Sequence, residues 1–157
     1  MFGVSSAVGC HVVVELGEVL YFNSNTTNAL NLDTSSVVVT GGTHVGGIVG
    51  RLNTGTLTNS TSSGAVTGAT QVGGLAGRVY YGSVTGSSST SAVTGTSSIA
   101  GGLVGYLEHT SSILNTSSHT TGLVKGVSNV GGLIGQSAGI VGEAVVSSTP
   151  TYTTFAT

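Results

Sequence analysis

The sequence predicts an all-β fold, a three-sided parallel β-solenoid (β-helix) of about four to five coils. A hexapeptide with two adjacent glycines and a third at its end occurs four times. Its first glycines, Gly46, Gly73, Gly101 and Gly131, lie 27, 28 and 30 residues apart, which sets the coil length at 27–30 residues. Between the hexapeptides, short aliphatic runs alternate with Gly, Ser, Thr and Asn, a pattern typical of strands and turns. No interval has the pattern of a helix of normal length.

The glycines of the four hexapeptides are the predicted structural motif. Glycines at the same corner of every coil indicate either a backbone with positive φ or close contact with the neighbouring coil. In both cases a β-carbon would cost stability. The motif glycines are Gly46, Gly47 and Gly50; Gly73, Gly74 and Gly77; Gly101, Gly102 and Gly105; and Gly131, Gly132 and Gly135.

A coil of this kind cannot stand alone, because its strands leave their backbone N–H and C=O groups without partners. Stacking the next coil about 4.8 Å away pairs these groups in parallel ladders and closes an apolar interior. Three aliphatic columns are predicted to line that interior. They are Ile48, Leu75, Leu103 and Leu133; then Leu57, Val84, Ile113 and Ile140; and then Val66, Val93, Val124 and Val145.

The run Gly-Gly-Leu-x-Gly is complete at residues 73–77, 101–105 and 131–135, and Ile48 replaces its leucine in the first hexapeptide. This run, with its period and the Asn/Ser-rich middle of each repeat, resembles the GLUG repeat over roughly residues 38–146. GLUG repeats occur in large bacterial and protist surface proteins, including adhesins and the non-catalytic parts of some secreted peptidases. The resemblance implies a β-solenoid in a surface or extracellular protein. It supplies no catalytic residue.

The period predicts one domain over residues 1–157. Residues 1–37 follow the period poorly and are expected to form an atypical first coil or cap. Residues 38–146 hold the regular GLUG-like coils, and residues 147–157 form an extended tail. With its single proline and its Thr, Tyr and Phe content, the tail suits a linker or a strand that pairs with a neighbouring molecule.

Charge is scarce in this chain. Charged residues make up 5% of it, against about 25% in a typical domain, and the net charge is −2. Its three basic residues, Arg51, Arg78 and Lys125, leave no electrostatic footprint for nucleic acid or an acidic membrane. No apolar run is long enough to insert across a bilayer. A weakly charged surface rich in hydroxyls does permit close association between copies.

We predict no catalytic, cofactor-binding or metal-binding residues, and therefore no enzyme. The histidines His11, His44, His109 and His119 show no ligand spacing. The five acidic residues are scattered over different phases of the repeat, whereas a carbohydrate-cleaving β-helix needs carboxylates on one face. The Thr-x-Thr sequences at residues 54–56, 94–96 and 149–151 also differ in their phase within the repeat, which argues against an ice-binding array of threonines. Cys10 is the only cysteine and is expected to be buried or to link two molecules.

Three sequons are possible N-glycosylation sites, at Asn25, Asn59 and Asn115. Asn59 and Asn115 are expected at equivalent repeat positions. A structural explanation, in which asparagine side chains bond to the backbone of successive turns, is therefore at least as good as glycan attachment.

Arg51 and Arg78 both follow the last glycine of a hexapeptide, and Tyr106 and Gln136 take that place in the next two coils. We expect this column to face outward, with neighbouring members about 5 Å apart. The third repeat is longer, because Glu108, His109 and Thr110 are inserted before Ile113. A loop is expected there.

Two functions follow as hypotheses, both extracellular or at the cell surface. The first is a structural subunit of a fibre or surface assembly, a homopolymer that self-associates through open solenoid ends and terminal strands. The second is a stalk or ligand-binding module of a larger adhesin, engaging glycans or host surface proteins. Its first expected contacts are Tyr80, Tyr81, Tyr106 and the Glu108–His109 insertion.

Overall fold

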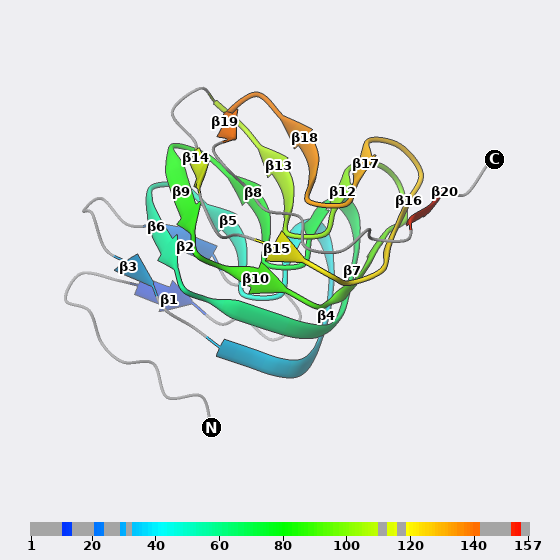
Figure 1. The fold of residues 1–157 in the computed structure, drawn as a ribbon, viewed down its shortest axis with the longest axis horizontal. Coiled ribbons are helices and arrows are strands. Elements are labelled where there is room, and N and C mark those ends of the chain that lie inside the picture. The colour runs from blue at the N-terminus through cyan, green and yellow to red at the C-terminus, as the bar shows by residue number, and fades with distance from the viewer. Residues whose placement is uncertain are drawn as a thin grey trace.

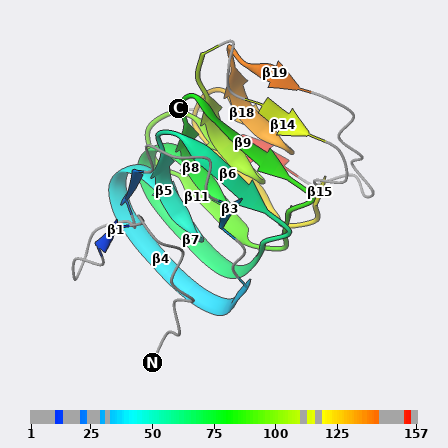
Figure 2. The same cartoon turned by 90° about the vertical axis from the view of Figure 1, so that its left-hand side faces the viewer.

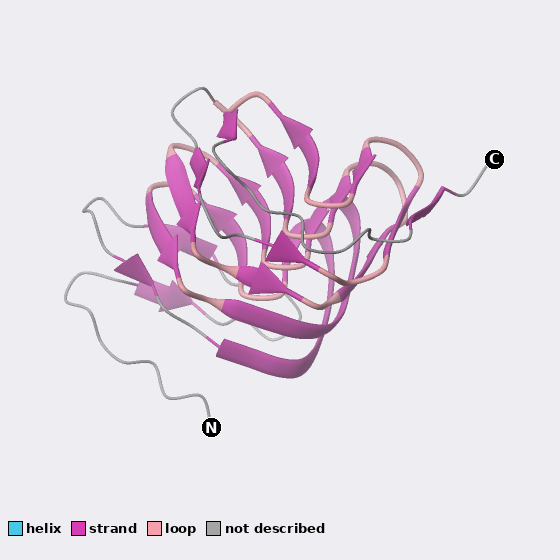
Figure 3. Cartoon of the chain, in the orientation of Figure 1, coloured by secondary structure: helices cyan, strands magenta, loops and turns pink. Residues whose placement is uncertain are grey.

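The computed structural model describes residues 11–13, 21–23, 29–30, 33–109, 113–115, 119–141 and 152–154. All regular structure in these ranges is β-strand. The chain winds as a parallel β-solenoid of about three turns, as predicted in class (Figure 1). Figure 3 shows strands along all the sides of the turns and loops at the corners.

Three sheets form the sides of the solenoid. Sheet A contains, in spatial order, β1 (His11–Val13), β2 (Tyr21–Asn23), β5 (Val49–Leu52), β8 (Ala76–Val79), β13 (Val104–Leu107) and β18 (Ile134–Ser137). Sheet B contains β3 (Ala29–Leu30), β6 (Gly55–Thr58), β9 (Gly82–Thr85), β14 (Ile113–Asn115) and β19 (Ile140–Val141).

Sheet C begins with two long strands, β4 (Asp33–Gly46) and β7 (Thr61–Gly73), which pair side by side (Figure 2). In later turns the same path is divided into shorter strands. These are β10 (Ser88–Ser89), β11 (Ala92–Gly95) and β12 (Ala100–Gly101), and then β15 (His119–Thr120), β16 (Val124–Gly126) and β17 (Val130–Gly131). β20 (Tyr152–Thr154) pairs with β16.

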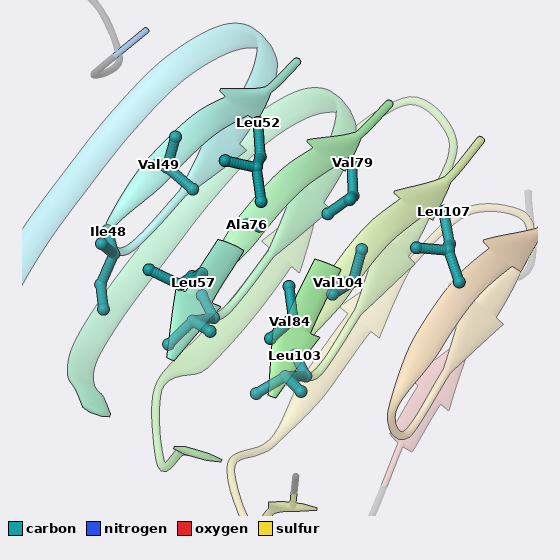
Figure 4. Packing of buried hydrophobic residues seen from close by; sticks show 11 residues of the cluster. Ile48, Val49, Leu52, Leu57, Ala76, Val79, Val84, Leu103, Val104 and Leu107 are labelled. Atoms are coloured by element: carbon teal, nitrogen blue, oxygen red, sulfur yellow. The ribbon is translucent and has the colours of Figure 1, made fainter. Parts of the chain in front are cut away.

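The first predicted column is confirmed. The amide of Ile48 donates to the carbonyl of Leu75, that of Leu75 to Leu103, and that of Leu103 to Leu133. Ile48, Leu75 and Leu103 are buried in a core cluster between sheets A and B, and Leu133 packs against it half-buried. Figure 4 shows Ile48 and Leu103 in this cluster. Aliphatic residues therefore continue each other from turn to turn, as stacking requires.

The second predicted column is wrong in its last two members. Leu57 pairs with Val84, but Val84 then pairs with Leu114, and Leu114 with Val141. Ile113 and Ile140, predicted for this column, lie one residue away. Leu114 lies seven residues after Leu107, whereas Val84 lies five after Val79, so two residues are added after β13 and the column falls one residue later than predicted. A difference of one residue reverses the face of every side chain in a strand.

The third column holds for Val66, Val93 and Val124, which are buried in a second cluster enclosed by sheet C. Its predicted last member, Val145, lies outside the described residues, and Tyr152 pairs with Val124. Residues from both halves of the long strands meet in this cluster. A β-carbon on Gly68 would lie only 2.6 Å from Val45 Cγ2, so a glycine lets the strand bend around the cluster.

Each motif glycine has its own steric reason. A β-carbon on the first glycine, Gly73, would overlap the carbonyl oxygen of Ala76, three residues later. One on the second, Gly74, would overlap the carbonyl oxygen of Gly102 in the next turn. One on the third, Gly105, would lie 2.7 Å from the carbonyl carbon of Gln71. The close-contact interpretation of the motif is therefore the one that these positions support.

The other interpretation, that the motif glycines have positive φ, is wrong, because positive φ occurs at other residues. The described glycines with positive φ are Gly55, Gly64 and Gly86, and the non-glycine residues are His44, Asn59, Gln71, Tyr81, His109 and Asn129. None belongs to the hexapeptide glycines. Two of them, Tyr81 and His109, lie at the corner that follows a strand of sheet A.

The predicted four to five coils overstate the length of the solenoid. At the N-terminal end, β1 pairs with β2 in antiparallel fashion, so this segment adds a hairpin and not another parallel coil. The strands of the last turn are short, and its Leu133 and Ile134 are only partly buried. No helix in the described ranges is long and apolar enough to cross a membrane.

Candidate binding site at an aromatic and charged corner

A corner between sheets A and B gathers the side chains of greatest chemical interest. Tyr80 and Tyr81 follow β8, and Glu108 and His109 follow β13 one turn further on. The backbone ladder continues into this corner, because the amide of Tyr80 donates to the carbonyl of Leu52 at 2.7 Å and that of Glu108 to Val79 at 2.9 Å. The ladder therefore holds the two pairs in register across neighbouring turns.

Tyr81 and His109 form the outer part of this corner. Their ring centroids are 4.1 Å apart, and the Tyr81 hydroxyl lies 3.0 Å from His109 Nε2. Both residues have positive φ, 55° and 70°, which is uncommon for large side chains. Such backbone conformations cluster at ligand-binding positions, where the surrounding structure holds them. Tyr81 is 43% exposed and is one of the few large hydrophobic residues that the surface displays.

Tyr80 is the centre of the corner. Its ring meets that of Tyr81 edge to face at 4.2 Å. The guanidinium carbons of Arg51 and Arg78 lie 5.5 and 5.7 Å from its centroid, within cation–π range. A side-chain hydrogen bond with Tyr80 raises the pKa of Tyr81 above its ordinary value.

The two arginines differ in their partners. Arg78 forms an ion pair with Glu108, and its Nη1 lies 3.2 Å from His44 Nε2. Arg51 has no ion-pair partner among the described residues, and its Nε is buried without a hydrogen bond there. Burial lowers the pKa of His44, and the charges of Arg78 and Arg51 lower it further, so His44 is neutral at pH 7. The corner thus carries one compensated and one uncompensated positive charge.

Among the side chains that the structure describes, this corner holds most of the charges. Four charged side chains are described, and three of them, Arg51, Arg78 and Glu108, lie here; Lys125 is on sheet C. The chain as a whole is only 5% charged and 5% aromatic. Charges and aromatic rings that are scarce elsewhere and collected at one exposed corner indicate a binding site.

Comparison with protein families gives two matches, at residues 41–67 and 68–94, both to the family described as the GLUG motif. The chain contains GLUG repeats. Each matched repeat begins near the bend of sheet C, passes through sheets A and B, and returns to sheet C, so one GLUG repeat makes one turn. The comparisons with curated proteins and with solved structures gave no match.

The GLUG match covers less of the chain than the expected residues 38–146. The hexapeptides at 100–105 and 130–135 lie outside it, yet Gly73 pairs with Gly101, and Gly101 with Gly131. The later turns therefore continue the GLUG register. The corner itself joins the two, since Arg51, Arg78, Tyr80 and Tyr81 lie in the matched GLUG repeats, and Glu108 and His109 follow them.

Most of the expected contact residues meet in this corner. Tyr80, Tyr81, Glu108 and His109 do so, whereas Tyr106 pairs with Arg78 in the column beside it. The predicted Arg51, Arg78, Tyr106 and Gln136 column is confirmed in register, and its first three members are half-buried. Sequence reasoning missed His44, which belongs to sheet C. Its position one residue before Val45, equivalent to Gln71, is the only available signal.

The sequons are not equivalent, contrary to expectation. Thr85 pairs with Thr58 in one neighbouring turn and with Asn115 in the other. Asn115 therefore corresponds to Thr58, and Asn59 comes one residue later, because the same slip displaces β14. Asn59 is exposed and has a φ of 46°; Asn25 and Cys10 lie outside the described residues.

Nothing in the corner forms a metal site in the described part of the chain, where no three His, Cys, Asp or Glu side chains gather. Glu108 is the one carboxylate described at the corner, and it is held by Arg78. The other functional groups of the corner are guanidinium ions, phenols and imidazoles. They are suited to holding a ligand by stacking and charge-assisted hydrogen bonds.

Proposed function

We propose that this chain is a structural module of an extracellular or cell-surface assembly, in which copies stack end to end through strand β4. The observation that supports the proposal most is the open outer edge of β4. This strand is 14 residues long and pairs with β7 on one side, and no described strand pairs with its other side. An edge of this length presents a row of backbone groups to a further strand.

Within the described residues, little protects this edge. Edge strands are commonly blocked by lysine, proline or a bulge. One register shift lies between Thr34 and Val37, but residues 38–46 contain neither lysine nor proline, and Val38 is 75% exposed. The part of β4 after the shift thus has the properties of a pairing surface.

The opposite end supplies a complementary surface. Leu103 and Val104 are fully buried in the third hexapeptide, whereas their equivalents Leu133 and Ile134 are only partly buried. A further turn stacked there would complete their burial, as it does in the interior. A contact between unlike ends is heterologous, and it produces a filament unless the rotation closes a ring. β20 pairs within its own chain, so the proposal rests on β4 and not on the tail.

The test is the association state of the purified chain across a range of concentrations, by sedimentation velocity and negative-stain microscopy. Val38→Lys places a charge on the open strand and should abolish the assemblies. Ala92→Lys is the matched control, because Ala92 lies in the same column of sheet C but on β11, whose two edges are both paired. A monomer at every concentration, or equal loss in both variants, would refute stacking through β4.

A second candidate function is supported by a different observation, the corner of Arg51, Arg78, Tyr80, Tyr81, Glu108 and His109. Here the GLUG turns would serve as a ligand-binding module of a larger surface protein. The two functions are compatible, since β4 lies at one end of the column and the corner lies along its side. Binding of a ligand that depends on corner residues is the test of this candidate.

A further inference from the structure

We propose that this corner binds an anionic saccharide, one whose sugar units carry carboxylates. The inference rests on the second candidate function and names the ligand class for it. It is carried by the Arg51 guanidinium, which has no ion-pair partner among the described residues, and by the exposed aromatic ring of Tyr81 in the same corner.

The preference for an anion comes from the charges in the corner. Glu108 pairs with Arg78, and burial and both arginines lower the pKa of His44, so Arg51 is the positive group that has no ion-pair partner among the described residues. The Arg51 side chain is half-buried, and its Nε has no hydrogen-bond partner in the described residues. A guanidinium presents parallel N–H groups that match the two oxygens of a carboxylate.

Tyr80 helps to hold this guanidinium in place. The Tyr80 ring lies beside both arginines, and Arg78 is anchored in turn by Glu108 and His44. A second cation held beside the ring limits how Tyr80 can move. Arg51 therefore meets a ligand from a defined position, which reduces the entropy lost on binding.

The preference for a saccharide comes from the aromatic surface and its neighbours. Tyr81 is exposed, and its contacts with Tyr80 and His109 fix the ring, so that it offers a flat face for the C–H groups of a sugar ring. Sheet B continues this surface with hydroxyls. Ser83 Oγ donates to Thr56 Oγ1 at 3.0 Å, just beyond the corner in two adjacent turns. Stacking faces and hydroxyls together suit a ring that carries both.

Other anions fit the surface less well. A nucleic acid needs many phosphate contacts, but the chain has three basic residues and a net charge of −2. An acidic peptide would use Arg51 but has no ring with C–H faces to stack on Tyr81. The proposal therefore commits to the carboxylated saccharide, and a glutamate-rich peptide serves as the competing probe.

The test is binding of the full chain to galacturonate oligosaccharides by isothermal titration calorimetry. Galactose oligosaccharides of the same length and a glutamate oligopeptide are the matched probes. Arg51→Gln should weaken galacturonate binding about tenfold, since it removes a charge-assisted pair. Tyr81→Asn removes the ring but tolerates positive φ, and should weaken binding to a similar degree. Lys125→Gln, on sheet C away from the corner, should leave the affinity within about twofold.

The outcomes separate the levels of the proposal. Equal affinity for galactose oligosaccharides, lost in Tyr81→Asn, would overturn the anionic class but keep a binding module at the corner. Tighter binding of the glutamate peptide would overturn the saccharide class. Binding that neither variant weakens, or no binding to any probe, would overturn the corner as a site together with the second candidate function. A thermal unfolding curve of each variant distinguishes lost binding from lost folding.

Discussion

Gly77 lies directly against the backbone of His44. A β-carbon at position 77 would come 2.5 Å from the His44 carbonyl carbon and 2.7 Å from the carbonyl oxygen of Gln71. This approach brings β8 of sheet A against the bend of sheet C, and from that bend the His44 side chain reaches Arg78. The last glycine of the GLUG hexapeptide therefore both closes the turn and places a residue of the candidate site.

Gly77→Ala should destabilise the fold by about 1–3 kcal/mol or more, because backbone atoms that cannot move aside surround the new methyl group. Gly42→Ala is the matched control. A β-carbon on Gly42 meets nothing within 4 Å, and its backbone φ is not in the left-handed region, so alanine should be neutral or stabilise by up to about 1 kcal/mol. Urea denaturation measures both, and equal effects would contradict the close-packing explanation.

Truncating a leucine of the first aliphatic column should reduce the free energy of unfolding less at the end of the solenoid than in its middle. Leu75→Ala removes a fully buried side chain and is expected to cost about 2–5 kcal/mol. Leu133→Ala removes the same atoms where the side chain is partly exposed, so its cost should be clearly smaller. The free energies of unfolding from urea titration check this order. The reverse order would mean that the last turn is covered in the isolated chain.

Stability should fall as the pH drops below neutrality, in part through His44. Burial, followed by the charges of Arg78 and Arg51, holds the pKa of His44 below its ordinary 6.5, although Glu108 acts in the opposite direction. The unfolded chain therefore binds a proton at this residue more readily than the folded chain. The contribution of His44 is fully present above about pH 6.5 and is lost as the pH falls below that value.

His44→Asn isolates this effect, since asparagine does not titrate and tolerates the φ of 54°. Urea midpoints at pH 7.5 and pH 5.5 should differ less in the variant than in the parent chain. An identical difference in both proteins would assign the pH dependence to other groups.

Asn59 should tolerate glycine better than alanine. Its φ of 46° lies in the left-handed region, which costs an ordinary residue about 1–2 kcal/mol. Asn59→Ala is expected to lose about that amount of unfolding free energy, and Asn59→Gly much less. Chemical denaturation of both variants is the measurement. If glycine proves as damaging as alanine, the contact of the Asn59 amide group with Gly86 in the next turn, and not the backbone conformation, determines the stability at this position.

The class of fold could be predicted because each turn requires the same residue types at equivalent positions. Paired backbones permit only glycine at positions such as Gly74, and the interior accepts only aliphatic residues at positions such as Leu75. The prediction failed where the repeat loses its phase. Leu114, and not Ile113, continues the column of Val84. Both residues are aliphatic, so composition alone does not choose between them, and the register depends on how the inserted residues are accommodated.

The candidate site was less predictable than the fold. The equivalence of Arg51 and Arg78 follows directly from the period. The contacts of Glu108 with Arg78 and of His109 with Tyr81 arise because Glu108 and His109 continue the register of Tyr80 and Tyr81, whereas the sequence pattern assigned both residues to an insertion. His44 comes from another sheet, and a pattern that repeats along the sequence carries no information about which sheets touch at a corner.

Gly46, Gly73 and Gly101 pair with one another in consecutive turns, and every turn offers its neighbour the same ladder of backbone groups. If one whole turn is duplicated or deleted in the gene, the turns on either side of the change therefore still pair through the same ladder of backbone groups. Length can change in units of a turn, by recombination between repeats, while the rest of the column keeps its packing. Residues that differ between turns, such as those of the corner, are then free to diverge on a scaffold that is copied unchanged beneath them.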